Sequence, residues 1–249
     1  MKRPFIIAHR GAPEYIRENT LASIALALRL GAGMVEIDVR RTKDGVLVVH
    51  HEDRIAGMSR PIEALTWPAV RPRIQDAGLP APYRIPTLRK VLAVFGDKFP
   101  LAIEIKSPGA EKSLIRLLSR NRGRGHVVIA PYETFRKIRS LDPTLPVHLL
   151  IHPSPRQGFS NWIRGLLSLV HLRVEGASGL VVHRALARPC LIRRAHRKGL
   201  SVTVWTVDSA GEMQRFIRWG VDGIITNRPH LLLQVIMKME KGENGHPEV

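Results

Sequence analysis

Cysteine, aromatic residues and long apolar runs are scarce in this chain of 249 residues, and each scarcity excludes a class of protein. The single cysteine, Cys190, excludes an internal disulfide and is typical of a reducing compartment, and we expect it to be a small buried apolar residue. No apolar run reaches the roughly 20 residues that a membrane-spanning helix needs. The apolar run after the basic N-terminal residues is too short for a signal peptide. We therefore expect a soluble, cytoplasmic protein.

Acidic residues are also few, since 39 lysines and arginines against 21 aspartates and glutamates give a net charge of +18. This charge attracts anions, and it predicts a weak, salt-sensitive attraction to an anionic membrane surface. Aromatic residues make up only 5% of the chain, and the basic residues are scattered. Proteins that bind single-stranded nucleic acid combine basic grooves with stacking aromatics, so a specific nucleic-acid partner is disfavoured.

Strand-like and helix-like runs alternate along the whole chain, which predicts an α/β protein with a mostly parallel sheet. Helices are expected near residues 21–30, 88–95, 110–119, 134–141, 162–170, 189–198, 210–219 and 230–239. Strands are expected near 5–8, 34–39, 46–49, 101–105, 127–130, 147–151, 179–182, 202–207 and 223–226. An eight-stranded barrel requires one strand fewer. Either the strand over 46–49 is an accessory return strand, or one later strand is wrongly assigned.

The turn between the second and third expected strands predicts which histidine faces the site. Asp44-Gly45 between apolar runs is a strong signal for a two-residue hairpin loop. With these two residues in the loop, counting back along both strands places Asp38 opposite His51. Strand alternation then sends the neighbouring His50 to the opposite face.

Three carboxylates lie at or near the ends of two expected strands, Glu36 and Asp38 on one and Glu104 on the other. Glu36 and Asp38 project to the same side, because alternate side chains of a strand share a face. At ~4 Å and an effective dielectric near 20, two such charges repel by about 4 kcal/mol, which favours a bound cation. An all-oxygen ligand set favours Mg²⁺, Ca²⁺ or Mn²⁺ over zinc. The alternative is an ion-pair network with Arg40, Lys106 or Arg10.

A series of short motifs runs in a fixed order from the N-terminus almost to residue 230. They are His9-Arg10-Gly11, Glu18-Asn19-Thr20, Gly31-Ala32, Glu36-Ile37-Asp38-Val39, Thr42-Lys43-Asp44-Gly45, Val48-Val49-His50-His51, Ile103-Glu104-Ile105-Lys106, Val204-Trp205-Thr206-Val207 and Gly223-Ile224-Ile225-Thr226. In this order they resemble the glycerophosphodiester phosphodiesterase family, within the wider phospholipase-C-like phosphodiesterase group. The chain departs from the usual pattern at Arg17, where Pro is usual, and at Gly33, Glu52 and Asn227, where Asp is usual or common.

The resemblance implies a single (β/α)8 TIM-type barrel with its site at the C-terminal ends of the strands. It implies that Glu36, Asp38 and Glu104 are ligands of one divalent cation, Mg²⁺ or Ca²⁺, with Mn²⁺ as a further candidate. It also implies that His9 and His51 are the acid/base pair, a role that suits imidazole because its ordinary pKa lies near 6.5.

The same resemblance implies that Arg10 and Lys106 contact phosphate oxygens and that Trp205 lines the substrate cleft. Plain core packing is the alternative role for Trp205. Glu18 and Asn19 contribute to the substrate pocket or simply begin the first helix.

The barrel is expected to span residues 1–240, with a small insertion at its mouth over 53–84 and a disordered tail over 241–249. The implied reaction is hydrolysis of a small-molecule glycerophosphodiester to glycerol 3-phosphate and an alcohol. One rival is a related phosphodiesterase that cleaves lysophospholipids in the manner of a phospholipase D, which apolar insertion residues in the pocket would favour. Another is a catalytically inactive, basic binder of nucleic acid or membrane surfaces, which the intact set of site residues disfavours.

Overall fold

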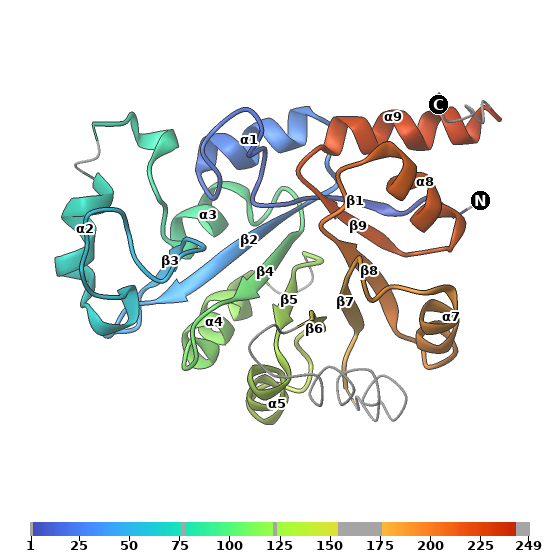
Figure 1. Ribbon diagram of the computed structural model, residues 1–249. Coiled ribbons are helices and arrows are strands. Elements are labelled where there is room, and N and C mark those ends of the chain that lie inside the picture. Colours follow the sequence, from blue (N-terminus) through green and yellow to red (C-terminus); the bar gives the residue numbers. More distant parts are fainter. Residues whose placement is uncertain (1, 76–77, 122–123, 154–175, 243–249) are drawn as a thin grey trace.

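Eight parallel strands form a closed barrel at the centre of the protein (Figure 1). The computed structural model describes residues 2–75, 78–121, 124–153 and 176–242. The barrel strands are β1 (Phe5–Ala8), β2 (Met34–Arg41), β4 (Leu101–Ile105), β5 (Val127–Ala130), β6 (Val147–Ile151), β7 (Gly179–His183), β8 (Ser201–Trp205) and β9 (Gly223–Thr226). Strand β1 pairs with both β2 and β9, which closes the ring. The predicted TIM-type barrel is confirmed.

Helices surround the barrel and cover its outward-facing apolar side chains (Figure 1). They are α1 (Leu21–Arg29), α3 (Leu88–Phe95), α4 (Glu111–Leu118), α5 (Tyr132–Leu141), α7 (Pro189–Arg197), α8 (Ala210–Arg218) and α9 (Pro229–Glu240). Helix α1 begins where the Thr20 hydroxyl accepts a hydrogen bond from Ser23 N, and it ends before Gly31, which has a positive φ of 91°. The helix expected over 162–170 and most of the expected tail lie outside the described residues.

Strand β3 (Leu47–Val49) is the one described strand that does not belong to the barrel. It is the accessory return strand, and it pairs antiparallel with β2. In the observed register Val39 faces Val49, and His50 N donates a hydrogen bond of 3.0 Å to Asp38 O. The backbone therefore sets Asp38 opposite His50. The prediction that Asp38 lies opposite His51 is wrong by one residue.

The turn itself explains the shift in register. Thr42 N donates to Val46 O at 2.9 Å, so the loop holds the three residues 43–45 and not Asp44-Gly45 alone. The Thr42 hydroxyl accepts from Val46 N at 2.9 Å, and Gly45 has a φ of 92°. A three-residue loop that ends in a left-handed glycine is the next most common hairpin connection.

Residues 53–75 and 78–84 form a small layer beside the barrel, with helix α2 (Trp67–Gln75) and the short helices η1 (Ile62–Ala64) and η2 (Ala81–Tyr83) (Figure 1). Their apolar side chains pack against one another and against β3. This cluster contains Val48, Ile55, Ile62, Val70, Ile74 and Ile85. Helix α2 was not predicted, because Pro72 lies inside it and hides the helical pattern.

The interior of the barrel changes from apolar to polar within two residues along most of its strands. One apolar layer crosses the barrel, formed by Ile7, Met34, Ala102, Ile129, Val181 and Ile225. Alternate residues of a strand point to the same side, so the next inward positions lie one step closer to the C-terminal mouth. Five of these six positions hold polar or charged residues, namely His9, Glu36, Glu104, His183 and Asn227, and the sixth holds Pro131. The apolar layer thus forms the floor beneath the charged residues.

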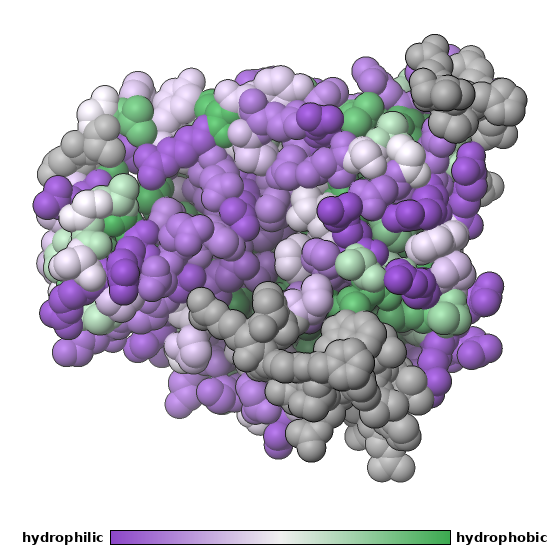
Figure 2. Space-filling view, in the orientation of Figure 1, coloured by the Kyte–Doolittle hydropathy of each residue, from purple (hydrophilic) through white to green (hydrophobic). Residues whose placement is uncertain are grey.

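The surface corrects one expectation. Cys190 is exposed near the start of α7, so the prediction that it is buried is wrong. The buried face of this helix is formed by Ile192 and Ala195 instead. Hydrophilic side chains dominate the face of the molecule that is shown in Figure 2. Among the described residues, every helix is too short or too polar to cross a membrane.

Candidate active site

Three carboxylates meet inside the barrel where β2 and β4 lie side by side. The parallel register places Asp38 directly beside Glu104, and Glu36 lies two residues before Asp38 on the same face. Oxygen atoms of the three side chains lie within 4.8 Å of one another. All three are buried, with exposed fractions of 2% for Glu36, 1% for Asp38 and 9% for Glu104. The structure thus brings the predicted ligand set together.

Glu36 lies in the least favourable electrostatic position of the three carboxylates. Its Oε2 accepts a hydrogen bond of 3.1 Å from Arg10 N, whereas its Oε1 has no hydrogen-bond partner among the residues that the structure describes. Burial, followed by the charges of Asp38 and Glu104, raises the pKa of Glu36 well above its ordinary value. A buried carboxylate in this state is compensated poorly by the protein itself.

The other two carboxylates are compensated by cations. The Lys106 ammonium contacts Glu104 and lies 3.1 Å from Asp38 Oδ1. Burial raises the pKa of Asp38, but the charges of Lys106 and Arg10 outweigh it, and the net change is downward. Burial keeps the pKa of Glu104 above its usual range despite Lys106.

These residues fit a hard divalent cation. Every donor is a carboxylate oxygen, which is the ligand type that Mg²⁺ and Ca²⁺ prefer. The ion would also supply a partner to Glu36 Oε1, the buried oxygen that the described residues leave unpaired. A closed ion-pair network was the alternative, and Lys106 and Arg10 do pair with Asp38. That network leaves Glu36 without a cation of its own.

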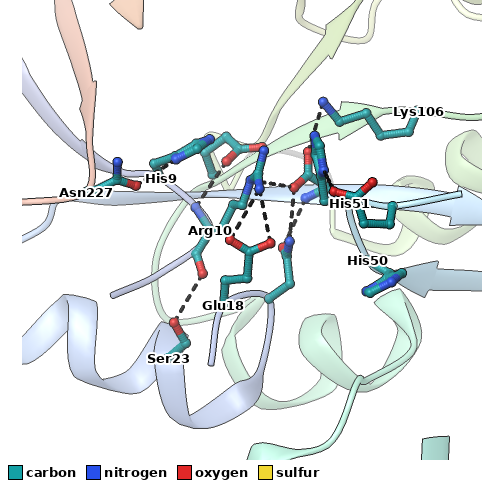
Figure 3. A network of polar contacts seen from close by, with 12 residues as sticks. His9, Arg10, Glu18, Ser23, His50, His51, Lys106 and Asn227 are labelled. Atoms are coloured by element: carbon teal, nitrogen blue, oxygen red, sulfur yellow. Dashed lines mark hydrogen bonds and ion pairs between the residues drawn. The ribbon is translucent and has the colours of Figure 1, made fainter. Parts of the chain in front are cut away.

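Arg10 connects the first loop to the carboxylates from a left-handed backbone conformation, with a φ of 53°. Its guanidinium lies 3.0 Å from Asp38 Oδ2 and donates from Nη1 to Glu18 Oε1 at 3.0 Å (Figure 3). Its backbone N–H is the group that binds Glu36. The predicted residues Arg10 and Glu18 therefore both lie at the carboxylate cluster.

Asn19 orients one of the carboxylates. Its Nδ2 donates to Asp38 Oδ2 at 2.9 Å, and its Oδ1 accepts from Asp38 N at 3.2 Å. Thr20 caps helix α1, so the side chain of Asn19 is not needed for the cap. Its φ of 56° is one that asparagine tolerates better than most residues. Asn19 therefore faces the site and does not cap the helix.

His9 leaves β1 beside the end of β9, because Ala8 pairs with Thr226 and His9 N donates to Thr226 O at 2.9 Å. Its Nδ1 lies 2.8 Å from Asn227 Oδ1. Burial and then the charge of Arg10 lower the pKa of His9. The ring is therefore neutral near pH 7.

His51 reaches the carboxylates by a route that the register did not predict. Strand β3 ends at Val49, so strand alternation does not extend to His50 or His51. His51 lies close enough to Asp38 and Glu104 to act on both carboxylates electrostatically. His50 makes a contact of 3.2 Å with Arg54 O, and Figure 3 shows it apart from Lys106. His51 Nδ1 lies 2.8 Å from Glu52 Oε1. The pairing argument that supported His51 was wrong, and its part in proton transfer stays a prediction.

Residues 9–231 match the model of the glycerophosphoryl diester phosphodiesterase family. The chain belongs to this family. It is 34% identical to the glycerophosphodiester phosphodiesterase of Caldanaerobacter subterraneus over 95% of this chain and 99% of that protein. It is 28% identical to the glycerophosphodiester phosphodiesterase of Bacillus subtilis over 94% of this chain and 86% of that protein. The prediction of an enzyme of this family is confirmed.

Solved structures of the glycerophosphodiester phosphodiesterase family share the fold. The enzyme from Parabacteroides distasonis is 25% identical and superimposes with a TM-score of 0.78, covering 96% of this chain and 98% of its own. An Oleispira antarctica phosphodiesterase, solved in complex with the product sn-glycerol-3-phosphate, is 22% identical with a TM-score of 0.75. The match covers 94% of this chain and 97% of that one. The second similarity supports the barrel alone.

Sequence reasoning missed the residues that hold the His51 loop of this phosphodiesterase. Arg40 Nε donates to His51 O at 2.8 Å, and Arg40 Nη1 donates to Glu63 Oε1 at 2.7 Å. The Ser107 hydroxyl also donates to Glu63. Glu63 lies in η1, so these bonds fix the insertion and His51 to β2 and β4 together. The available signal was Arg40, which follows Glu36 and Asp38 with the same two-residue spacing on β2.

Trp205 lies on a cleft at the ends of β7 and β8, which supports its predicted place at the barrel mouth. The cleft has a volume of about 550 Å³, and its lining includes His183, Trp205, Asp208 and Arg228. The rings of His183 and Trp205 meet edge to face with their centroids 5.3 Å apart. Trp205 also packs on the apolar layer of the barrel. That it lines a substrate cleft stays a prediction.

Proposed function

We propose that this enzyme hydrolyses small glycerophosphodiesters to glycerol 3-phosphate and an alcohol at one divalent cation, Mg²⁺ or Ca²⁺. The observation that carries the proposal is the buried, unpaired oxygen of Glu36 within a cluster of three carboxylates that can reach one ion. The names of the relatives from Caldanaerobacter and Bacillus support the substrate class. The product complex of the Oleispira protein supports it as well.

Glu36, Asp38 and Glu104 would hold the ion. When bound, a divalent cation neutralises phosphate charge and acidifies the attacking hydroxyl or water. Arg10 and Lys106 lie at the same carboxylates and can donate hydrogen bonds to phosphate oxygens, Arg10 as a fork and Lys106 as a point charge. The five groups together provide a binding place for a phosphodiester anion.

His9 and His51 would transfer the protons of the reaction. A P–O bond of the diester breaks and a new P–O bond forms to the attacking oxygen, which loses its proton to one imidazole. The other imidazole donates a proton to the departing alkoxide, so the alcohol leaves neutral. Each ring is bonded through Nδ1, His9 to Asn227 and His51 to Glu52, so in each ring Nε2 remains for this transfer.

The insertion supports a small substrate over a lysophospholipid. Apolar insertion residues in the pocket would have favoured the lysophospholipid reading. Ile55, Ile62, Val70 and Ile74 instead bury their side chains in the separate cluster against β3. They are thus used for packing of the insertion.

The test is release of glycerol 3-phosphate from a panel of glycerophosphodiesters and one lysophospholipid, each with Mg²⁺, Ca²⁺, Mn²⁺ or excess chelator. We expect release from the small diesters with a divalent metal and loss of turnover in chelator. Full turnover in chelator would refute the metal site. Cleavage of the lysophospholipid alone would establish the rival substrate class.

A further inference from the structure

His9 is held from behind by two residues that lie outside the metal cluster. Its Nδ1 lies 2.8 Å from Asn227 Oδ1. Asn227 Nδ2 donates to Asp208 Oδ2 at 2.7 Å, and Asn227 N donates to Asp208 Oδ1 at 2.8 Å. Asp208 Oδ1 also accepts from the Thr226 hydroxyl at 3.0 Å. The carboxylate of Asp208, in the loop after β8, thus binds both Thr226 at the end of β9 and Asn227 directly after it.

These contacts fix which ring nitrogen of His9 carries the proton. A carboxylate such as Asp208 only accepts hydrogen bonds, so the amide group that faces it must be the Nδ2 donor of Asn227. The Oδ1 of the same amide then faces His9, and an amide oxygen also only accepts. With the amide reversed, two oxygens would meet at 2.7 Å without a proton between them. The neutral His9 ring must therefore carry its proton on Nδ1.

We propose that Asn227 and Asp208 are positioning residues that hold His9 in the Nδ1–H form and leave Nε2 as the proton-accepting atom. That His9 transfers a proton at all rests on the proposed function, whereas the ring form does not. The logic matches that of a catalytic histidine whose tautomer is set by a hydrogen-bonded partner. Figure 3 shows Asn227 beside His9, on the side away from His51.

The uncharged partner distinguishes His9 from the other histidine. His51 is bonded to the carboxylate of Glu52, whereas His9 is bonded to an amide, at a position where Asp is common in the family. The charged groups around His9 are Arg10, which lowers its pKa, and Asp38 and Glu18, which raise it. An added carboxylate at position 227 would directly favour the protonated ring.

The decisive measurement is the ring form of His9 by long-range ¹H–¹⁵N NMR on the metal-free protein without substrate. In the wild type we expect a neutral ring protonated on Nδ1. Asn227→Ala should release the ring into a mixture of both forms. Asn227→Asp should restore the Nδ1–H form, because a carboxylate also accepts from it. A wild-type ring protonated on Nε2, or an unchanged form in Asn227→Ala, would overturn the proposal.

Kinetics separate positioning from a merely structural role. Asn227→Ala should lower kcat by roughly 10- to 100-fold, as loss of an orienting partner typically does, with KM little changed. Asn227→Asp should recover most of kcat and shift the acidic limb of the pH profile of kcat/KM to higher pH. The proposal would be contradicted if Asn227→Ala kept full kcat and the acidic limb of Asn227→Asp did not shift.

A matched control removes a nearby carboxylate outside this contact chain. Glu14 pairs with Arg228, next to Asn227, and is not among the groups that set the pKa of His9. Glu14→Gln should leave the ring form and the pH profile unchanged. If the wild type hydrolyses none of the diesters, the proposed function fails, yet the NMR measurement still decides whether Asn227 sets the ring form.

Discussion

The two ends of the barrel compensate their charged residues to different degrees. At the N-terminal end, Asp222 is fully compensated, because it pairs with Lys2 and His196 and accepts from Val202 N at 2.7 Å. At the C-terminal mouth, one oxygen of Glu36 has no partner in the part of the chain that the structure describes, and burial raises the pKa of this carboxyl. The apolar layer of the barrel separates the two ends. The difference supports the proposal that charge at the mouth binds a ligand, whereas charge at the bottom stabilises the fold.

Backbone strain follows the same division. Among the described residues, the non-glycine residues with positive φ are Arg10 and Asn19, and both lie at the mouth. Such conformations cost of order 1–3 kcal/mol each for a non-glycine residue, less for asparagine. Here they aim Arg10 N at Glu36 and Asn19 at Asp38. Strain and unpaired charge thus occur together at the end that carries the chemistry.

The largest expected effect comes from Glu36→Gln, which should lower activity and raise stability. We expect kcat/KM with Mg²⁺ to fall by roughly 10³-fold, because metal-ion catalysis is worth several kcal/mol. A folded-state pKa above the unfolded value costs stability as pH rises, so the metal-free variant should have a larger free energy of unfolding than the wild type at pH 8. Steady-state kinetics and urea denaturation of the metal-free protein measure both effects.

The control for Glu36→Gln is Asp222→Asn at the other end of the barrel. Asp222→Asn should leave kcat/KM unchanged. It should lower the free energy of unfolding by about 1 kcal/mol, because it weakens the ion pairs and the hydrogen bond of Asp222. Mg²⁺ should raise the melting temperature of this control and of the wild type, but not that of Glu36→Gln. If Glu36→Gln lost stability and kept its turnover, the contrast between the two ends would be wrong.

A second prediction compares histidines at the two ends. General acid–base catalysis contributes about 10²- to 10⁴-fold, so His9→Ala and His51→Ala should each lower kcat by that order with little change in stability. The double variant should lose much less than the product of the two losses, because both rings act in one proton-transfer cycle. His50→Ala should change kcat by less than about tenfold, since general acid–base catalysis is not lost with it. Steady-state kinetics and thermal melts of the four variants test this.

His126 provides the control at the bottom of the barrel. It is buried, and its Nδ1 accepts a hydrogen bond of 3.0 Å from Leu101 N at the start of β4. His126→Ala should destabilise the protein by about 1 to 3 kcal/mol without changing kcat, because it leaves a buried N–H unpaired. Loss of turnover in His50→Ala with retention in His51→Ala would reverse the assignment of the catalytic histidine.

The fold was predictable because each element carries its own local signal. The alternation of strand-like and helix-like runs located the barrel strands and most of the described helices. The hairpin register was not predictable from Asp44-Gly45, because the Thr42 hydroxyl closes the loop one residue earlier. Such a side-chain bond competes with the backbone preference of the turn itself.

The candidate site was only partly predictable. Glu36, Asp38 and Glu104 stand out because carboxylates are costly inside a buried strand. Asn227 and Asp208 do not stand out in this way, because both follow strands and lie in expected loops, where polar residues are common. Their relation to His9 depends on the closure of the barrel, which brings β9 beside β1. A contact between residues more than 200 positions apart has no counterpart in a local pattern.

The smallest expected effect concerns His148, which points into the bottom of the barrel from β6. It lines a cavity of about 460 Å³ together with residues of the apolar layer. Burial lowers the pKa of His148 from 6.5 to about 4, and the charge of Asp222 offsets this only in part. Below pH 6.5 His148 therefore binds a proton in the unfolded chain, whereas in the folded protein it stays neutral down to about pH 4. Stability should fall as the pH decreases across this window.

The size of this loss is limited by solvent. The full difference in pKa is worth roughly 3 kcal/mol, and partial exposure of the ring reduces it to about 1 to 2 kcal/mol. His148→Leu should remove this loss between pH 7 and pH 4 and leave kcat at pH 7.5 unchanged. Urea denaturation at several pH values measures it, and the other histidines with lowered pKa values cancel because both proteins contain them. If the pH profiles of stability of the wild type and His148→Leu were parallel, His148 would have the same pKa in the folded and unfolded states, and the prediction would be wrong.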